Sequence, residues 1–548
     1  MKRRISAILS MALTLAVVMT ACGNAGSGSA SSAAANTKKP VSTDKYLNIS
    51  VGEGENPTTF DVQKTTEYYA VPLNIFDRLV ECQLDGKETK IVSGLAKTWD
   101  ISKDGLVYTF HLSQGVKFSN GEELKADDVV FTVNRMMDPA TKADNTDVFS
   151  MIKGAQDVYD GKAKTVEGVK AVDAYTVQIT LEKAFAPFLA NLAVPGASIY
   201  NRKATEAAGD KFGIDPASTV GTGPFIPKTW KLNSEIIMEK NANYFKGAPK
   251  LEGVRFKIVT DPNTAKMMFE NGELDVFDAV DNAQSQIPYF KQSEKWKNNI
   301  VSGPKAGIFY YAFNESVKPL DNPKVRKAIQ MAIDRKSIVE QLYYGEGVIA
   351  NTIVPTGILG YNKDAQEIKY DVNAAKQLLA DAGYPNGFDL EIFQSNSSTD
   401  SLQCNQVVQS MLGQIGVKVK ITQLDDATYL AKRKDGGLTM YRSEWSADYN
   451  DPDNFLYTFF SAKNAKVRST NYNNKQVMDD LEKARIMVNQ DERMKLYHSC
   501  EQTILQDDAM FLPLFQQNHI FIVSDRVKDF HVSWNGWSSM SYYGVSLG

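Results

Sequence analysis

Residues 441–456 hold the side chains best suited to bind a charged ligand. The stretch reads YRSEWSADYNDPDNFL, with Arg442 six residues before Asp448 and Trp445 between them. An arginine binds a carboxylate through two parallel hydrogen bonds, whereas an aspartate binds an ammonium group through a charge-assisted bond. Together with an aromatic wall, these groups could recognise a ligand that carries a positive end and a negative end.

A plainer interpretation of the same stretch is a surface turn. Asp, Asn and Pro favour turns through local side-chain hydrogen bonds and a fixed backbone angle. Pro452 interrupts the run of acids, and Trp445 and Phe455 could simply belong to the core, where large aromatic residues are mostly found. Spacing alone does not decide between a binding site and a turn.

The sequence carries no motif for catalysis. It has no G-x-S-x-G elbow, no phosphate-binding loop and no dinucleotide-binding glycine pattern. Its four histidines include no pair with H-x-x-x-H spacing, which argues against a zinc hydrolase. Adjacent acids such as Asp425 and Asp426 are typical of solvated faces and helix starts. We therefore expect neither an enzyme nor a cofactor.

The composition is that of an ordinary globular protein. Of 548 residues, 43% are hydrophobic and 23% are charged, and the net charge is -4. Such a length suggests about three or four domains. A nucleic-acid-binding protein would show an excess of basic residues. We therefore expect no nucleic-acid partner.

The N-terminus has the features of an export signal. Lys2, Arg3 and Arg4 precede an apolar segment over residues 8–19, which is short for a transmembrane helix. The segment ends Met19-Thr20-Ala21-Cys22 and resembles a bacterial lipoprotein signal, in which the cysteine is lipidated. Met19 departs from the leucine more common in that pattern, and an ordinary signal peptide is the alternative.

Residues 23–39 are nearly all Gly, Ala, Ser, Asn and Lys, a composition too poor in large apolar residues to fold. We therefore predict a lipoprotein signal peptide over residues 1–22 and a flexible tether over residues 23–45. Lipidation of Cys22 would hold the protein at the cell membrane, on its extracytoplasmic face, which is either the cell surface or the periplasm.

The remaining cysteines are Cys82, Cys404 and Cys500. An odd number at wide spacing argues against a disulfide framework in an exported protein. One pair could still form, although the sequence does not say which. We favour buried free thiols.

The apolar pattern predicts alternating strands and helices. Residues 46–51 (YLNISV) alternate as a strand does, and the wide apolar face of residues 69–80 predicts a helix. Lys103-Asp104-Gly105 predicts a hairpin turn before a strand over residues 107–112. Residues 126–137 predict a helix with acids near its positive end. This alternation favours an α/β architecture.

Residues 95–138 carry a long pattern rather than a short motif. Its fixed points are Trp99, Asp104-Gly105, Tyr108-Thr109-Phe110, Gly115, Phe118, Gly121, Ala126 and Asp128-Val129. The pattern resembles the signature region of the family 5 extracellular solute-binding proteins, whose best-known members bind oligopeptides and dipeptides for ABC importers. Residues 220–225 (VGTGPF) and 374–388 (AAKQLLADAGYPNGF) are similar to further parts of that family. The resemblance extends over about residues 46–535.

The resemblance implies an α/β, two-lobed periplasmic-binding-protein-like (type II) fold with an extra inserted domain and a ligand cleft between the lobes. It implies hinge crossings near residues 300 and 516. The implied domains are domain I over residues 46–80, 190–300 and 516–548, domain II over residues 81–189, and domain III over residues 301–515.

The resemblance also assigns roles within the first stretch. Asp448 matches the aspartate that binds the peptide N-terminus. Arg442 and Arg433 match basic positions that meet peptide carboxylates or side chains. The segment beside the peptide backbone comprises Ser443, Glu444, Trp445 and Ser446.

Two further parts of the chain match ligand contacts of the family. Thr66 and Tyr68 fall where the first lobe supplies the opposite edge of the cleft. Phe149, close to Asp147 in sequence, falls where domain II offers an aromatic ring. All of these assignments come from the resemblance and not from spacing.

The stretch departs from the best-known peptide binders at three positions. Asp426 stands where they have tryptophan, and Ser446 stands where they have cysteine, so their cleft disulfide should be absent. Glu444 stands where they have a small residue and adds a negative charge. A ligand with a basic side chain is therefore favoured.

The implied function is capture of peptides by hinge closure and their delivery to the permease subunits of an ABC transporter, by a monomer with no metal site. Relatives that bind nickel complexes, opines or oligosaccharides remain alternatives, although an ammonium anchor at Asp448 argues against a sugar. A peptide or pheromone sensor without transport is a further alternative, which the sequence does not separate from a transporter component.

Overall fold

The protein is described by a computed structural model over residues 44–52, 56–66, 69–86, 88–279, 284–536 and 540–548. All of these residues belong to a compact unit formed by residues 43–548. Cys22, the predicted signal peptide and most of the predicted tether lie outside the described residues. Every helix within the described ranges is too short or too polar to cross a membrane.

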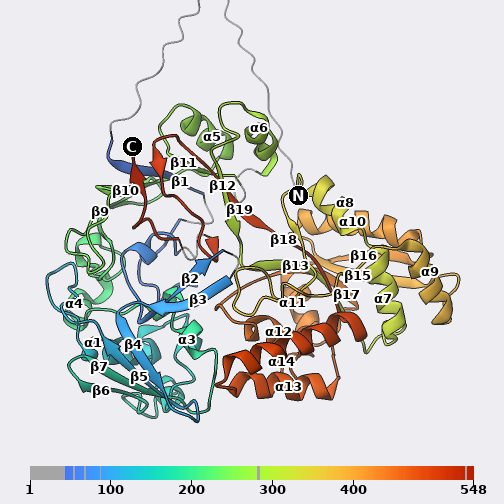
Figure 1. The fold of residues 1–548 in the computed structure, drawn as a ribbon, viewed down its shortest axis with the longest axis horizontal. Coiled ribbons are helices and arrows are strands. Elements are labelled where there is room, and N and C mark those ends of the chain that lie inside the picture. Colours follow the sequence, from blue (N-terminus) through green and yellow to red (C-terminus); the bar gives the residue numbers. More distant parts are fainter. Residues whose placement is uncertain (1–43, 53–55, 67–68, 87, 280–283, 537–539) are drawn as a thin grey trace, which may run out of the picture. The chain divides into compact units, whose positions relative to one another are not determined.

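The first sheet has seven strands and is built from segments far apart in sequence (Figure 1). The strand β1 lies near its centre and pairs in parallel with β10 and β11. Both faces of β1 are buried, as is usual for a parallel strand. In order across the sheet, the strands are β12 (Ile300–Pro304), β19 (Asn518–Val523), β11 (Val276–Asp278), β1 (Tyr46–Val51), β10 (Gly253–Ile258), β9 (Glu235–Lys240) and β8 (Phe225–Lys231).

Separate apolar clusters cover the two faces of this sheet. On one face, α5 (Pro262–Glu270) and α6 (Ile287–Gln292) pack through Phe269 and Phe290. On the other face, Phe76 and Tyr200 pack with Ile49 of β1. This second cluster lies beside α4 (Arg202–Ala208) and the short two-stranded pair β20 (Val527–Lys528) and β21 (Ser546–Leu547).

Residues 80–191 form a hairpin and a four-stranded antiparallel sheet with a core of their own. In β5 the side chains of Tyr108, Phe110 and Leu112 are buried while the alternate ones are half-exposed, because successive side chains of a strand point to opposite faces. The elements are β2 (Val80–Asp85), β3 (Glu88–Ser93), β4 (Ala96–Ile101), β5 (Val107–Leu112), α1 (Ala126–Met137), α2 (Ala155–Tyr159), β6 (Val169–Asp173), β7 (Thr176–Thr180) and α3 (Phe188–Asn191).

The second large sheet has six strands and lies among helices from residues 323–502 (Figure 1). Its strands, in order, are β14 (Val348–Ile349), β18 (Phe511–Gln516), β13 (Gly307–Phe313), β17 (Met440–Ser446), β15 (Asp389–Ser395) and β16 (Lys418–Leu424). The helices are α7 (Pro323–Ala332), α8 (Arg335–Leu342), α9 (Val372–Asp381), α10 (Thr399–Gly413), α11 (Asp426–Lys434), α12 (Asp453–Phe460), α13 (Lys475–Ile486) and α14 (Gln490–Gln502).

The chain passes between the two large sheets at two adjacent connections. Residues 305–306 join β12 to β13, and Gln517 joins β18 to β19. The two connections touch, because the amide of Lys305 donates to the carbonyl of Gln517 at 3.2 Å. The strands on either side also pair, β12 with β19 and β13 with β18 (Figure 1).

Most of the local predictions are confirmed. The strand over residues 46–51, the hairpin around Asp104 and the helix over residues 126–137 all form. The carboxylate of Asp128 accepts a bond from the amide of Lys125 at 2.9 Å and so caps that helix. Cys82, Cys404 and Cys500 are free thiols, as favoured, although Cys82 is only half-buried.

The predicted helix over residues 69–80 is wrong. Only a 3₁₀ turn forms, over Pro72–Asn74, and its residues are buried. The Asn74 side chain donates to the carbonyls of Ala70 and Met540, and its oxygen accepts from the amide of Tyr542 at 2.9 Å. The segment is therefore apolar because tertiary contacts surround it, and a wide apolar face does not distinguish this from a helix.

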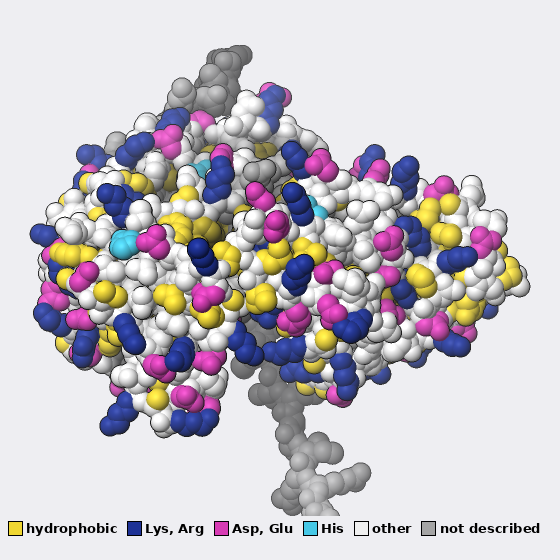
Figure 2. Space-filling view, turned by 60° about the horizontal axis from the view of Figure 1, so that its bottom comes forward, with side chains coloured by type: hydrophobic (Ala, Val, Ile, Leu, Met, Phe, Trp, Pro, Cys, Tyr) yellow, Lys and Arg dark blue, Asp and Glu magenta, His cyan; other side chains and the backbone are white. Residues whose placement is uncertain are grey.

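Lys and Arg side chains are interspersed with Asp and Glu side chains over the face seen in Figure 2. This mixed pattern agrees with the small net charge of -4. Ion pairs between exposed partners, such as Lys153 with Glu167 at 2.7 Å, contribute to it. Pairs of this kind add little to stability.

Candidate ligand-binding site

The strand β17 has one open edge. On one side it pairs with β13 along its whole length, from Met440 to Ser446. On the other side, β15 pairs only with Met440 and Tyr441. No described strand covers the rest of that edge. An extended peptide can add to such an edge through main-chain hydrogen bonds.

Asp448 follows this edge. Its side chain is exposed to solvent, yet surrounding protein atoms raise the pKa of its carboxyl by desolvation. Asp448 is therefore open to solvent on one side and close to protein atoms on the other. Its carboxylate accepts one bond, from the Asn454 side chain at 3.0 Å. Among the described residues, no Lys, Arg or His side chain lies within ion-pair distance of it.

The other acids of the stretch have internal partners. Asp451 holds Arg493 through two bonds of 2.7 and 2.5 Å, and both residues are buried. Asp453 pairs with Arg485 at 3.0 Å. These pairs fix the start of α12, from which Asn454 orients Asp448. Asp448 is therefore the acid of this stretch that remains available to a ligand.

Arg468 lies against the aromatic wall. Its guanidinium is 4.4 Å from the centre of the Trp445 ring and 5.2 Å from that of Phe459. Burial lowers its pKa, and the nearby positive charge of Arg433 acts in the same direction, whereas Asp448 raises it. Arg468 therefore lies close to both Arg433 and Asp448. The sequence-based prediction did not include Arg468.

Arg433 lies in the last turn of α11 and is half-buried. Its Nε is buried without a hydrogen-bond partner in the described part of the chain. Neither Arg433 nor Arg468 is within ion-pair distance of a carboxylate among the residues described. Arg433 is thus a second guanidinium close to Arg468, and together the two form a positively charged region suited to an anionic group.

Arg442 is placed differently from Arg433 and Arg468. Its side chain is buried and pairs with Asp400 at 2.8 Å. It also donates to the hydroxyls of Ser401 at 3.0 Å and Tyr343 at 2.5 Å. A strand turns successive side chains to opposite faces, so Arg442 and Trp445 lie on opposite faces of β17. Its predicted ligand contact stays a prediction: both terminal nitrogens have partners, and the remaining donor, Nε, is buried without a hydrogen-bond partner in the described part of the chain.

The other predicted residues of β17 vary in exposure. Ser443 and Trp445 are half-buried, and Ser446 is exposed. The Trp445 ring nitrogen donates to the Asn454 carbonyl at 2.9 Å. Glu444 lies 3.6 Å from the ammonium of Lys305, which offsets its charge. The structure therefore gives less reason for a basic ligand than the sequence did.

The predicted contacts before residue 150 are Thr66, Tyr68 and Phe149. Thr66 is exposed, and Tyr68 lies outside the described residues. Phe149 is buried in the core of residues 80–191 with 2% of its surface exposed. Its neighbour Asp147 is exposed instead, and the charge of Asp147 raises the pKa of Asp448. Asp147 therefore lies near enough to Asp448 to act on its carboxyl.

The two large mixed sheets are joined by two adjacent crossings, and residues 80–191 have a core of their own. This is a two-lobed α/β fold of the type II periplasmic-binding-protein kind, which solved structures share. The family described as bacterial extracellular solute-binding proteins, family 5, matches residues 90–467. The chain belongs to this family.

Individual relatives match along nearly the whole chain. Heme-binding protein A of Haemophilus influenzae is 32% identical over 98% of this chain and 99% of its own. The dipeptide-binding protein of Escherichia coli is 31% identical over 89% of this chain and 91% of its own. The solved structure of HbpA2 from Haemophilus parasuis, at 29% identity, superposes with a TM-score of 0.80 over 92% of this chain and all of that chain.

Proposed function

We propose that this solute-binding protein captures peptides by closure of two lobes and delivers them to the permease subunits of an ABC importer. Its relatives include a dipeptide-binding protein, and a structural neighbour at 30% identity is a DppA in complex with the peptide STSA. We assign residues 46–80, 190–300 and 516–548 to domain I, residues 81–189 to domain II and residues 301–515 to domain III. The connections at residues 305–306 and 517 are the proposed hinge.

The state of Asp448 carries this proposal. It is a solvent-facing carboxylate in a desolvating environment, with no cationic side chain of the described residues within ion-pair distance. A ligand ammonium would supply the missing partner. A charge-assisted bond of this kind forms with any peptide N-terminus, so the anchor recognises the peptide class and not its sequence.

The rest of the wall fits the other constant parts of a peptide. Arg468 and Arg433 can donate to the C-terminal carboxylate, and the open edge of β17 over Ser443–Ser446 can pair with the main chain. Side chains of the ligand take no part in these bonds. The arrangement therefore supports broad peptide recognition over recognition of one sequence.

Calorimetry with a set of short peptides tests the assignment. The Asp448→Asn variant should bind about 10–150-fold more weakly, since a hydrogen bond to a charged group contributes about 1.5–3 kcal/mol. Asp389→Asn, an exposed aspartate at the start of β15, is the matched control and should bind as the parent does. Equal affinities of all three proteins would remove Asp448 from the site.

Mass spectrometry of ligand carried through native purification identifies the solute directly. Peptides in the eluate support the proposal. A nickel complex, an opine or an oligosaccharide in their place would favour a non-peptide relative within the same family. Loss of peptide uptake on deletion of the gene separates transport from sensing, because a sensor leaves uptake unchanged.

We also propose that Cys22 is lipidated and holds the protein, as a monomer, on the extracytoplasmic face of the cell membrane. The support is the apolar segment over residues 8–19 followed by Cys22 and a polar tether. The Cys22→Ser variant should lose incorporation of labelled palmitate and leave the membrane fraction. Labelled palmitate in that variant would refute the assignment.

A further inference from the structure

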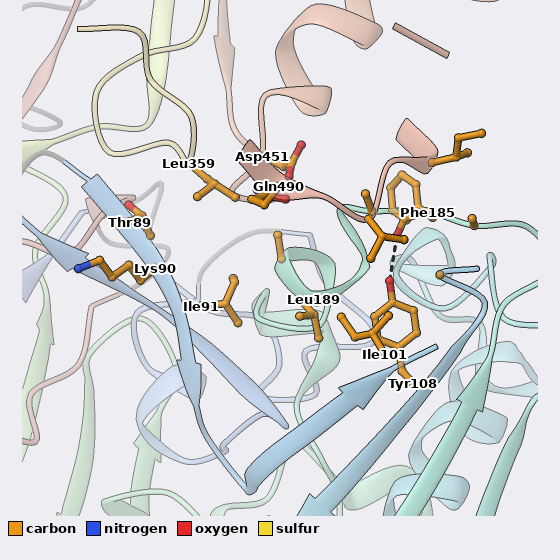
Figure 3. Close-up of a pocket in the computed structure, with 16 residues that line it drawn as sticks. Thr89, Lys90, Ile91, Ile101, Tyr108, Phe185, Leu189, Leu359, Asp451 and Gln490 are labelled. Atoms are coloured by element: carbon orange, nitrogen blue, oxygen red, sulfur yellow. Dashed lines mark hydrogen bonds between the residues drawn. The ribbon is translucent and has the colours of Figure 1, made fainter. Parts of the chain in front are cut away.

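A pocket lies between two parts of the chain, and neither Asp448 nor the open edge of β17 lines it. It has a volume of about 360 Å³, within the range of about 300–1,000 Å³ that is common for small-molecule sites. One wall comes from residues 89–190 and the other from residues 359–490. Figure 3 shows side chains of both walls around one space.

The lining of this pocket is mostly hydrocarbon. From the first wall it includes Ile91 of β3, Ile101 of β4, Tyr108 of β5 and Leu189 of α3, and from the second wall Leu359, Ile486 and Val488 (Figure 3). Three aliphatic side chains stay accessible: Ile101 is 39%, Ile486 is 54% and Val488 is 48% exposed. Exposed aliphatic groups around a hollow mark a site where an apolar ligand can replace water.

The charged groups of the lining are already engaged. Asp451 is held by Arg493 at 2.7 and 2.5 Å. The ammonium of Lys90 pairs with Asp85 at 3.1 Å and points away from the space in Figure 3. The Thr89 hydroxyl donates to the Gly357 carbonyl. The described lining therefore offers an ionic ligand no unpaired charge.

Contacts beside the pocket join its two walls. The amide of Ala186 donates to the carbonyl of Arg485 at 2.7 Å. The rings of Phe185 and Tyr449 meet edge to face at 6.3 Å. Gly105 approaches Val488 so closely that a Cβ atom would lie 3.0 Å from Val488 Cγ2. Tyr449 directly follows Asp448, so this junction adjoins the peptide anchor.

We propose that this pocket binds a small uncharged apolar molecule and that occupancy of the pocket favours the closed arrangement of the lobes, so raising peptide affinity. The effect of pocket occupancy on closure and on peptide affinity rests on the proposed function. The walls belong to domain II and domain III as assigned above, apart from Ala190, the first residue of the second segment of domain I. A ligand that contacts both walls binds better when they are together and shifts the equilibrium toward closure.

Binding is tested with the neutral fluorescent probe N-phenyl-1-naphthylamine and the purified mature chain. The parent should show saturable, one-to-one binding. Ile486→Asp introduces a charge at an exposed lining position and should weaken binding at least tenfold. Ile214→Asp alters an equally exposed isoleucine outside the pocket and should bind as the parent does. Non-saturable binding, or equal binding by all three proteins, would overturn the proposal.

Coupling is tested by titrating a peptide with and without saturating probe. The peptide dissociation constant should fall about fivefold or more with probe, the lower end of usual coupling between sites, and the effect should vanish in Ile486→Asp. An unchanged constant would overturn the link to closure. Asp448→Asn should lose peptide and keep the probe, which separates a failure of the pocket from a failure of the peptide site.

Light scattering addresses the one competing occupant, a second copy of the chain. A monomer that takes up the probe supports a small-molecule pocket. A dimer that excludes the probe, together with a monomeric Ile486→Asp variant, would show that the pocket is a contact between copies and would overturn the proposal.

Discussion

The guanidinium of Arg468 lies 4.4 Å from the centre of the Trp445 ring. The face of the Trp445 ring attracts the guanidinium of Arg468 and fixes its orientation. The N–H groups at the edge of the guanidinium remain able to donate hydrogen bonds. Arg433 lies close enough to lower the pKa of Arg468. An anionic group placed between them would therefore relieve the repulsion of two neighbouring positive charges.

Replacing Arg468 with glutamine should affect one end of the ligand. We expect the affinity for a peptide with a free C-terminal carboxylate to fall roughly 10–150-fold, because a hydrogen bond to a charged group is lost. The same peptide with a C-terminal amide should change little. Calorimetry measures both, with Lys463→Gln in the neighbouring exposed turn as control. Equal losses for both peptides would argue against a carboxylate at Arg468.

Peptide binding should depend on pH through Asp448. Desolvation raises the pKa of its carboxyl above the ordinary value of 3.8, so the anchor is protonated, and affinity falls, at a higher pH than for an ordinary aspartate. Titrations from pH 7 to pH 4 should show this loss in the parent. The Asp448→Asn variant should bind peptide weakly at every pH, because position 448 no longer titrates.

The stability of the ligand-free protein should change in the opposite direction. Because the native pKa of Asp448 is raised, the native state takes up a proton before the unfolded state does. The contribution of the Asp448 carboxyl to the free energy of unfolding is fully present below pH 3.8 and is lost as the pH rises through its native pKa. The melting temperature of the parent relative to Asp448→Asn should therefore increase on acidification toward pH 4.

The charge of Asp147 should affect the pKa of Asp448. Its negative charge raises the pKa of Asp448, so Asp147→Asn should lower this pKa and move the acid limit of peptide binding to lower pH. Asp144→Asn, at an exposed position in the same loop, is the matched control. An acid limit that stays at the same pH in Asp147→Asn would contradict the proximity of the two carboxyls.

The ion pair of Asp451 and Arg493 should be essential for stability. Asp451→Asn leaves a buried guanidinium without its counter-charge, and such changes cost about 3–5 kcal/mol. Urea denaturation should show this loss. Asp479→Asn, which breaks an exposed pair with Lys475 on α13, should change the free energy of unfolding by less than about 1 kcal/mol. Similar values for both variants would contradict the assigned burial.

Local signals in the sequence predicted local structure well. The hairpin at Asp104 and the helix over residues 126–137 depend on turn residues, apolar spacing and an acid near the helix start. The helix predicted over residues 69–80 does not form, because the apolar residues of this segment pack in the core and its backbone is held by contacts with Met540, Tyr542 and other distant neighbours. Periodicity cannot report contacts made by segments hundreds of residues away.

The site was predictable only in part. Asp448 and Trp445 lie in the stretch that its residue types singled out, whereas Arg468 lies outside that stretch and reaches it through folding. Strand alternation would have separated Arg442 from Trp445 had the stretch been interpreted as a strand. The open edge depends on where β15 stops pairing, which no residue of β17 encodes by itself.

The two contacting connections at residues 305–306 and Gln517 form a narrow two-stranded ribbon between the large sheets. A thin ribbon flexes readily across its flat face and resists bending within its own plane. As the proposed hinge, such a ribbon would favour a swing about a single axis. On that proposal, a ligand held by both lobes would have one degree of freedom to arrest, and a mutation that stiffens the ribbon should slow uptake of every peptide alike.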